Sequence, residues 1–335
     1  MEKQTPSVYV ASLSIRETEV AIKFIKDHFE EKLSKALNLT RVSAPLFVRK
    51  NSGLNDDLNG VERPVAFDVK SLNSETVEVV HSLAKWKRLA LKRYGFRVGE
   101  GLYTDMNAIR RDEDADALHS IYVDQWDWEK NIAKEERTSH TLFETVRTIY
   151  SVICELEKEV YRKYPQFQPI LPEEIHFVST QEMEDQYPNL SPKEREDAYA
   201  KDYKALFIFQ IGHALKSGLK HDGRAPDYDD WSLNGDIVVY NPVLNQAFEL
   251  SSMGIRVDET SLEKQLEIAN AQYRKAYPFH KALLNQELPY SMGGGIGQSR
   301  LCMYYLRKAH VGEVQASVWS DELEKDCAQK GIQLL

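Results

Sequence analysis

The segment 99–129 constrains the fold more than any other part of the chain, because two strand-like runs flank a charged link. Residues 101–109 have strand character, and residues 121–128 alternate polar and apolar side chains with the period of a β-strand. Two such strands predict a hairpin in which the charged link forms a long loop. We expect the rest of the chain to form the walls around it.

The second of these strands has two different faces. Gln125 and Asp127 recur at period two on one face, whereas Trp126 and Trp128 lie on the other. One face is therefore expected to be apolar. The polar face lies beside the charged link and favours a floor on which a ligand binds.

Arg110, Arg111 and Glu113 follow the first strand directly, so we expect them at a strand end, pointing into a cleft. The planar guanidinium of an arginine can hold a phosphate, and a nearby glutamate can orient that arginine or accept from an adenine amine. A solvated, charged hairpin is the alternative that these residues alone allow.

The composition limits what the protein binds. A chain of 335 residues, 42% hydrophobic and 28% charged, can bury a large core and is typical of a soluble enzyme. Its net charge of -9 disfavours a broad nucleic-acid surface, which needs clustered lysine and arginine. The three cysteines show no metal-ligand spacing, and neither a membrane span nor a signal peptide is evident, so we expect a cytoplasmic protein.

Two long amphipathic helices are expected, one beginning at Ser14 and one over residues 135–163. The first is followed by an extended segment, residues 39–50, whose Pro45 belongs at a sheet edge or a subunit boundary. A long helix followed by such a strand fits a dimer interface. Simple core packing explains the same pattern equally well.

The helix expected over residues 81–96 carries Lys87 within its apolar stripe, while Lys85, Arg88 and Lys92 lie on the opposite side. A buried ammonium needs a compensating partner. Lys87 is therefore a candidate for binding a substrate carboxylate, although a lysine whose stem lies along apolar surface is the simpler alternative.

Several carboxylates are candidates for holding cations. Asp56 and Asp57 lie in a polar loop and could bind an ammonium group, although most loop aspartates are merely solvated. Asp236 and Glu249 are expected at the ends of a pair of short strands, where they could share Mg²⁺ with phosphate oxygens. As a bare pattern, this metal signal is weak.

A glycine-rich run, SMGGGIG, precedes an apolar helix that carries Arg300 in its first turn. The glycines permit close approach of the backbone to a flat or charged ligand. The run matches neither a Walker loop nor a dinucleotide fingerprint. A glycine-rich turn packed against the helix is the alternative.

The order of these pieces resembles a class II aminoacyl-tRNA synthetase core. The helix ending in LTRVSAPLF resembles the first motif of that class, RRDE the second and GGGIGQSR the third. From end to end, the chain is similar to the family of ammonia-dependent asparagine synthetases, or aspartate-ammonia ligases. The similar segments are HSLAKWKR, RRDED, VDQWDWE, RAPDYDDW, ELSSMGIR and GGGIGQSR.

This resemblance implies an α+β fold in which helices flank an antiparallel β-sheet, with residues 1–335 forming a single catalytic domain that assembles as a homodimer. It also implies that aspartate, ATP and ammonia give asparagine, AMP and diphosphate through a β-aspartyl adenylate, with Mg²⁺ bound. Neither nucleic acid nor a membrane is an expected partner, since no segment is left over for an anticodon-binding domain.

The resemblance further implies roles for individual residues. The phosphates are expected to meet Arg110 and Arg300, with Mg²⁺ on Asp236 and Glu249. The aspartate β-carboxylate is expected at Lys87, and the substrate amino end at Asp56, Gln125 and Asp127. Ser252 and Arg256 would line a wall shared by both substrates, and Glu113, Asp229 and Gly294 would surround the nucleotide. The general class motif selects Arg111 for the phosphate, whereas the closer ligase pattern selects Arg110. An acyl-adenylate transferase with another acceptor, such as tRNA, and a non-catalytic sensor are the alternative functions.

Overall fold

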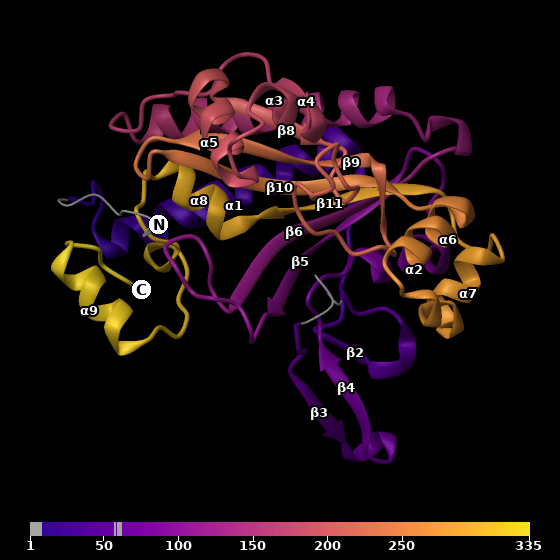
Figure 1. Ribbon diagram of the computed structural model, residues 1–335. Helices are drawn as coiled ribbons and strands as arrows, with labels where there is room; N and C mark the ends of the chain where they lie inside the picture. Colours follow the sequence, from indigo (N-terminus) through magenta and orange to yellow (C-terminus); the bar gives the residue numbers. More distant parts are fainter. Residues whose placement is uncertain (1–8, 57, 59–61) are drawn as a thin grey trace.

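The computed structural model describes residues 9–56, 58 and 62–335. Within them, the centre of the fold is an eight-stranded sheet that is antiparallel except for the outermost pair at each edge (Figure 1). Its strands, in order across the sheet, are β1 (Leu39–Arg41), β5 (Gly101–Ile109), β6 (Tyr122–Asn131), β11 (Ser291–Gly297), β10 (Gln246–Arg256), β9 (Asp229–Asn241), β8 (Ala205–Phe209) and β7 (His176–Ser179). Helices flanking a largely antiparallel sheet confirm the expected α+β class.

The hairpin expected from residues 99–129 is formed by β5 and β6. The two strands pair antiparallel from Gly101 opposite Lys130 to Ile109 opposite Tyr122. β11 then pairs with the other edge of β6, so the polar face of β6 lies near the middle of the sheet.

The glycine-rich run forms strand β11 and not a turn. Gly295 lies opposite Asp127, and Gly297 lies opposite Gln125. A Cβ atom at Gly295 would lie 2.3 Å from Gln125 Oε1 and 2.7 Å from Asp127 Oδ1. Glycine at position 295 therefore lets the polar side chains of β6 lean across this strand in their present orientation.

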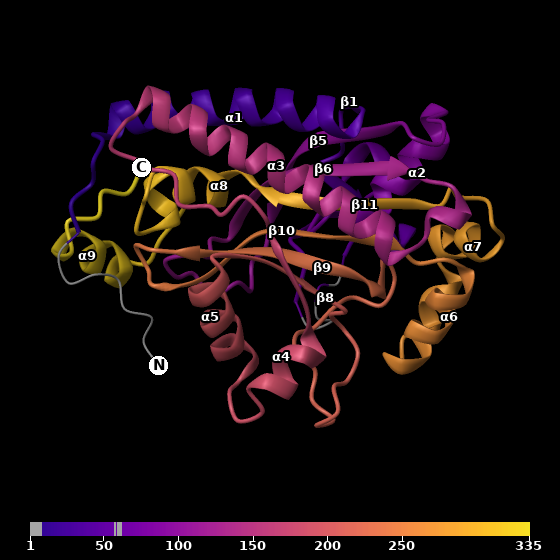
Figure 2. The ribbon, with the colours of Figure 1, turned by 90° about the horizontal axis from the view of Figure 1, so that it is seen from above.

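Helices α1 (Ile15–Leu37) and α3 (Ser139–Lys163) lie side by side on one face of the sheet, as Figure 2 shows. Ser14 caps α1 through its side chain, as expected. Phe29 of α1 packs against Trp126, with ring centroids 4.7 Å apart. The tryptophan face of β6 is thus buried against these helices, which leaves its polar face toward the other side of the sheet.

Helix α2 (Ala84–Tyr94) packs on that other side, and its Lys87 is buried as expected. Lys85 and Arg88, which were expected on the side opposite the apolar stripe, are buried as well. Lys85 pairs with Asp227 at 3.0 Å, and Arg88 donates to two main-chain carbonyls. Segments from the C-terminal half of the chain cover both sides of α2, which a helical pattern alone cannot reveal.

Strands β9 and β10 are longer than the short strands expected, with 13 and 11 residues. Asp236 lies opposite Ser252, and Glu249 lies opposite Val238, next to an irregularity in the pairing. Both carboxylates therefore lie inside strands and not at strand ends. Polar residues interrupt the apolar pattern of these strands, which made them look shorter in the sequence.

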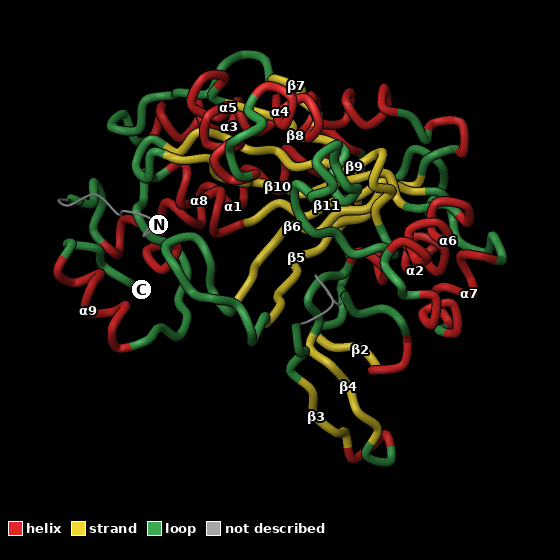
Figure 3. Tube along the Cα trace, in the orientation of Figure 1, coloured by secondary structure: helices red, strands yellow, loops and turns green. Residues whose placement is uncertain are grey.

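A small antiparallel sheet projects from the main body (Figure 1), and Figure 3 shows its strands set apart from the central sheet. Its strands, in order, are β2 (Phe47–Arg49), β4 (Glu75–Val79) and β3 (Ala66–Val69). The connection between β2 and β3 carries Asp56.

The remaining helices surround the sheet and its far end. They are α4 (Thr180–Gln186), α5 (Pro192–Tyr203), α6 (Glu259–Ile268), α7 (Pro278–Leu284), α8 (Gln298–Tyr305) and α9 (Asp321–Gln329). Short 3-10 helices occur at Lys50–Ser52, Lys70–Leu72, Lys134–Glu136, Gln272–Ala276 and Val311–Glu313. Across the described part of the chain, we find no helix with the length and apolar character needed to span a membrane.

Candidate active site

A cavity of about 420 Å³ opens over the polar face of the central sheet. β6, β10, β11, α2, the β5–β6 connection and the segment before β9 all contribute to its lining. The site residues expected from the sequence that line it are Asp56, Lys87, Arg110, Glu113, Gln125, Asp127, Asp229, Glu249, Ser252, Arg256, Gly294 and Arg300. Asp236 and Arg111 are not among the lining residues, and Asp57 lies outside the described part of the chain.

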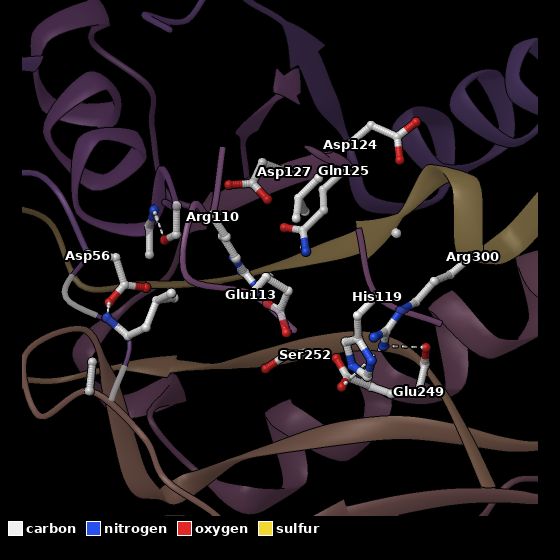
Figure 4. A pocket seen from close by; sticks show the side chains of 18 of the residues that line it. Asp56, Arg110, Glu113, His119, Asp124, Gln125, Asp127, Glu249, Ser252 and Arg300 are labelled. Atoms are coloured by element: carbon white, nitrogen blue, oxygen red, sulfur yellow. Dashed lines mark hydrogen bonds and ion pairs between the residues drawn. The ribbon is translucent and has the colours of Figure 1, made fainter. Parts of the chain in front are cut away.

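The side chains in the cavity come from both sides of it (Figure 4). Gln125 from β6 and Ser252 from β10 face one another across its centre, while Arg300 and Glu249 lie together at one end. Asp56 lies toward the opposite end. Residues far apart in the sequence are thus gathered around one volume.

Lys87 and Asp127 form a buried ion pair on the floor, with 3.1 Å between Lys87 Nζ and Asp127 Oδ2. Lys87 Nζ also donates to the main-chain oxygen of Gly294 at 3.0 Å. Burial lowers the pKa of Lys87, while Asp127 opposes that shift. An ammonium has three donors, so these two contacts leave one N–H of Lys87 for a ligand carboxylate.

Arg256 forms part of the wall and is held by acidic side chains. Its Nη1 donates to Asp229, and its Nε and Nη2 face the carboxylate of Glu129. Burial opposes the charge of Arg256, but Glu129 and Asp229 raise its pKa further above the usual range. This guanidinium is therefore charged and fixed in direction before any ligand arrives.

Arg110 and Arg300 are the cations of the cavity that were expected to meet phosphate. Arg110 lines the cavity, and its buried Nε has no hydrogen-bond partner among the described residues, whereas Arg111 is exposed. Arg300, in the first turn of α8, places Nη1 3.1 Å from the Glu249 main-chain oxygen and 3.5 Å from Glu249 Oε2. Both guanidiniums line the cavity and can thus contact an anion there, whereas Arg111 does not line it.

Asp236 and Glu249 interact electrostatically; Glu249 on β10 lines the cavity, whereas Asp236 on the neighbouring strand β9 does not. Asp236 Oδ2 accepts from Arg224, while its buried Oδ1 has no partner in the described structure. Burial raises the pKa of Asp236 to about 7; Arg224 opposes this shift and Glu249 adds to it. Two neighbouring carboxylates with an unused oxygen fit Mg²⁺, which prefers oxygen ligands.

The described residues contain no group of three or more His, Cys, Asp or Glu side chains arranged to hold a metal. A cation on Asp236 and Glu249 would therefore need further oxygen ligands from a bound molecule or from water. Mg²⁺ sites that include substrate phosphates have this character, because few protein carboxylates contribute to them.

Some residues of the cavity were not anticipated as site residues. Arg224 lines the cavity and pairs with Asp236. Its signal in the sequence is a cation that comes just before the acids of RAPDYDDW. Tyr228 lines the cavity within the same run, and burial raises its pKa well above the usual value. His119 also lines it, with Nδ1 2.8 Å from Asp116 Oδ1. A lone histidine in a loop carried no pattern that could have identified it.

A buried cluster supports the site from below α2. Asp227 Oδ2 lies 3.0 Å from Lys85 Nζ and 2.9 Å from both Arg274 Nη1 and His280 Nε2. Burial alone would raise the pKa of Asp227, but Lys85, His280 and Arg274 hold it well below the usual range. The cluster ties α2, which carries Lys87, to the segment that leads into β9.

Comparisons with known proteins agree over nearly the whole chain. The family model described as Aspartate-ammonia ligase matches residues 16–331. A protein named aspartate–ammonia ligase from Ruminiclostridium cellulolyticum is 67% identical over 330 residues, which are 98% of each chain. A protein of the same name from Limosilactobacillus reuteri is 60% identical over 336 residues, covering 100% of both chains.

Solved structures of class II synthetases share the fold. Entamoeba histolytica asparaginyl-tRNA synthetase in complex with asparaginyl-adenylate matches with a TM-score of 0.64 and 10% identity, over 90% of this chain and 66% of that one. Asparaginyl-tRNA synthetase from Pyrococcus horikoshii gives a TM-score of 0.62 at 14% identity, over 91% and 70%. The chain thus spans about two thirds of these synthetases. With its family-model match and close relatives, it belongs to the aspartate-ammonia ligase family.

Proposed function

We propose that this protein is an aspartate–ammonia ligase that makes asparagine, AMP and diphosphate from aspartate, ammonia and ATP. The observation that carries the proposal is the match to the family model over residues 16–331. The cavity supports it, since it combines a buried lysine, arginines and carboxylates within one volume. The reaction requires the same kinds of group, because the two carboxylates and the ammonium group of aspartate must be held next to a polyphosphate.

In the first step, an oxygen of the aspartate β-carboxylate attacks the α-phosphorus of ATP, and the bond to the diphosphate leaving group breaks. Two anions must approach each other, so fixed cations are needed to lower the barrier. We assign Lys87 to the β-carboxylate, because it lines the cavity and its contacts to Asp127 and Gly294 leave one donor. We assign Arg110 and Arg300 to the phosphates of ATP.

In the second step, ammonia attacks the β-carbonyl carbon of the adenylate. The bond between this carbon and the phosphate oxygen breaks, and AMP leaves with that electron pair. The nitrogen that came from ammonia loses a proton, which gives the amide. Asp56, Gln125 and Asp127 would hold the substrate amino end throughout. Ser252 and Arg256 would line the wall between the two substrates, with Glu113, Asp229 and Gly294 around the nucleotide.

Mg²⁺ belongs to this proposal as the ion held by Asp236 and Glu249. When bound there, it would neutralise phosphate oxygens and favour departure of diphosphate. The support on Asp236 is its buried, unused Oδ1, since its Oδ2 already pairs with Arg224.

The proposal extends to the assembly and location of the protein. We propose that residues 1–335 act as one catalytic domain in a cytoplasmic homodimer that binds no nucleic acid. Helix α1 and the proline-bearing segment after it resemble the first class II motif, which supports the dimer. The net charge of -9 argues against a nucleic-acid partner.

AMP formation tests the proposal directly. Purified protein should release AMP from ATP only when aspartate and ammonium are both present, and Lys87→Ala should lower the rate at least about a hundredfold, because it removes a buried charge-assisted contact. Lys92→Ala is the matched control, since Lys92 lies on the same helix with its side chain 46% exposed. Absence of AMP with the complete mixture would refute the function, and AMP that appears only with added RNA would assign another acceptor.

A further inference from the structure

Glu129 is a buried acid next to the cavity that takes no part in its lining. It lies near the end of β6 on the same face as Gln125 and Asp127, and its side chain has no exposed surface. Arg256 Nε lies 3.0 and 3.1 Å from the two Glu129 carboxylate oxygens, and Arg256 Nη2 lies 2.7 Å from Oε2. Ser291 Oγ adds a hydrogen bond of 2.7 Å to Oε1.

This contact determines the orientation of the Arg256 guanidinium relative to the cavity. A guanidinium has five N–H donors in one plane. Glu129 takes the Nε and one Nη2 donor, and Asp229 takes one Nη1 donor. One N–H on each terminal nitrogen remains, and Arg256 reaches the cavity lining. A two-pronged pair of this kind fixes the plane of the guanidinium as well as its position.

The neighbouring strand is built to make room for the pair. A Cβ atom at Gly293 would lie 2.1 Å from Glu129 Oε2 and 2.6 Å from Arg256 Nη2. It would also lie 2.5 Å from the main-chain oxygen of Trp128. Only glycine therefore allows the Glu129–Arg256 pair to cross β11.

We infer that Glu129 is a positioning residue for catalysis, which acts by holding Arg256 in the orientation that meets the reacting substrates. The inference rests on the function proposed above. Glu129 touches no ligand itself, so its whole catalytic effect must pass through Arg256. A residue that merely stabilises the fold would act independently of Arg256.

The decisive variant is Glu129→Gln, which keeps the shape but turns an amide N–H₂ toward the donors of Arg256. We expect kcat/KM for AMP formation to fall about a hundredfold, the usual effect of displacing a reacting group by about 1 Å. Arg256→Ala should cause a loss at least as large. The double variant should be no worse than Arg256→Ala alone. Losses that multiply in the double variant would overturn the inference.

Glu157→Gln is the matched control, because Glu157 is a buried carboxylate on α3 that pairs with Arg307 at 3.2 Å and does not line the cavity. It should lower the melting temperature and leave kcat/KM within about twofold. An equal loss of kcat/KM in this control would assign the effect of Glu129→Gln to stability and overturn the inference.

Ser291→Ala keeps the test decisive if Glu129→Gln fails to fold, since it removes only one hydrogen bond to Glu129. A loss of roughly tenfold in kcat/KM that vanishes in an Arg256→Ala background supports the inference, and an unchanged kcat/KM overturns it. The wild type is assayed first. Inactive wild type would refute the proposed function, whereas active wild type with fully active variants would refute only the role of Glu129.

Discussion

Replacing Gly295 by alanine separates substrate binding from folding more sharply than any other single change in the cavity. The added methyl group would lie 2.3 Å from Gln125 Oε1 and 2.7 Å from Asp127 Oδ1. Ordinary van der Waals contact begins at 3.4 Å, so the Gln125 amide must move by about 1 Å. Both obstacles are the free ends of side chains, so they can turn away without moving the sheet.

The expected result is a binding defect in a folded protein. Gln125 and Asp127 are proposed to hold the amino end of aspartate, and a hydrogen bond to a charged group contributes about 1.5–3 kcal/mol. Gly295→Ala should therefore raise KM for aspartate roughly ten- to hundredfold. The free energy of unfolding should change by less than about 1 kcal/mol, since alanine is better tolerated than glycine within a strand.

Gly294→Ala provides the contrast on the same strand. Its Cβ would lie 2.6 Å from Met253 Cβ and 2.7 Å from the Ser252 main-chain oxygen, so it meets packed atoms that cannot turn away. We expect a loss of about 1–3 kcal/mol in stability. The measurements are AMP release over a range of aspartate concentrations and denaturant unfolding of each variant. A folded Gly295→Ala protein with the wild-type KM for aspartate would show that Gln125 and Asp127 do not bind the substrate.

Three further predictions address the phosphate, metal and support sites. Arg110→Ala should lower kcat/KM for ATP at least about a hundredfold, whereas Arg111→Ala should change it less than threefold; the reverse order in steady-state assays would move the phosphate role to Arg111. Asp236→Asn and Glu249→Gln should each raise the Mg²⁺ concentration for half-maximal rate roughly tenfold or more, and a Mg²⁺ titration with wild-type midpoints would exclude this pair. Asp227→Asn should cost about 3–5 kcal/mol at pH 7, measured by urea unfolding, because it leaves buried cations without their partner. The pKa of Asp227 is lower in the folded state than in the unfolded state, so its ionised carboxylate stabilises the fold above the unfolded pKa, and this stabilisation is lost as pH falls below about 4. An equal dependence of the unfolding free energy on pH in wild type and variant would contradict this.

Local patterns in the sequence predicted the features that depend on near neighbours. The alternation in residues 121–128 gave the two faces of β6, and the helical stripe gave the buried position of Lys87. Burial of Lys85 was missed because its partner Asp227 lies in a segment 142 positions further along the chain. Glu129 was missed for the same reason. Its partner Arg256 lies 127 positions away, and pairing with it requires Gly293 on a third strand.

The site roles came largely from resemblance and not from the residues alone. Asp56, in a polar loop, gave no sign that it would be 2% exposed, since its burial depends on how the small sheet meets the main body. The cavity gathers the expected residues in one place, but their individual roles stay predictions until a ligand or a variant tests them.

The junction between the two sheets can make the site selective for the length of the amino-acid side chain. His81 holds the chain at Asn55 and Asp56, with its Nδ1 2.9 Å from the Asp56 main-chain oxygen and its main-chain N–H donating to Asn55 Oδ1 at 2.9 Å. Lys87 follows six positions later on the same continuous stretch. With the roles proposed here, that stretch holds the partners of the amino group and of the β-carboxylate at a set separation. Glutamate, which is longer by one methylene, could not satisfy both partners at once, so the chain would select its substrate by length.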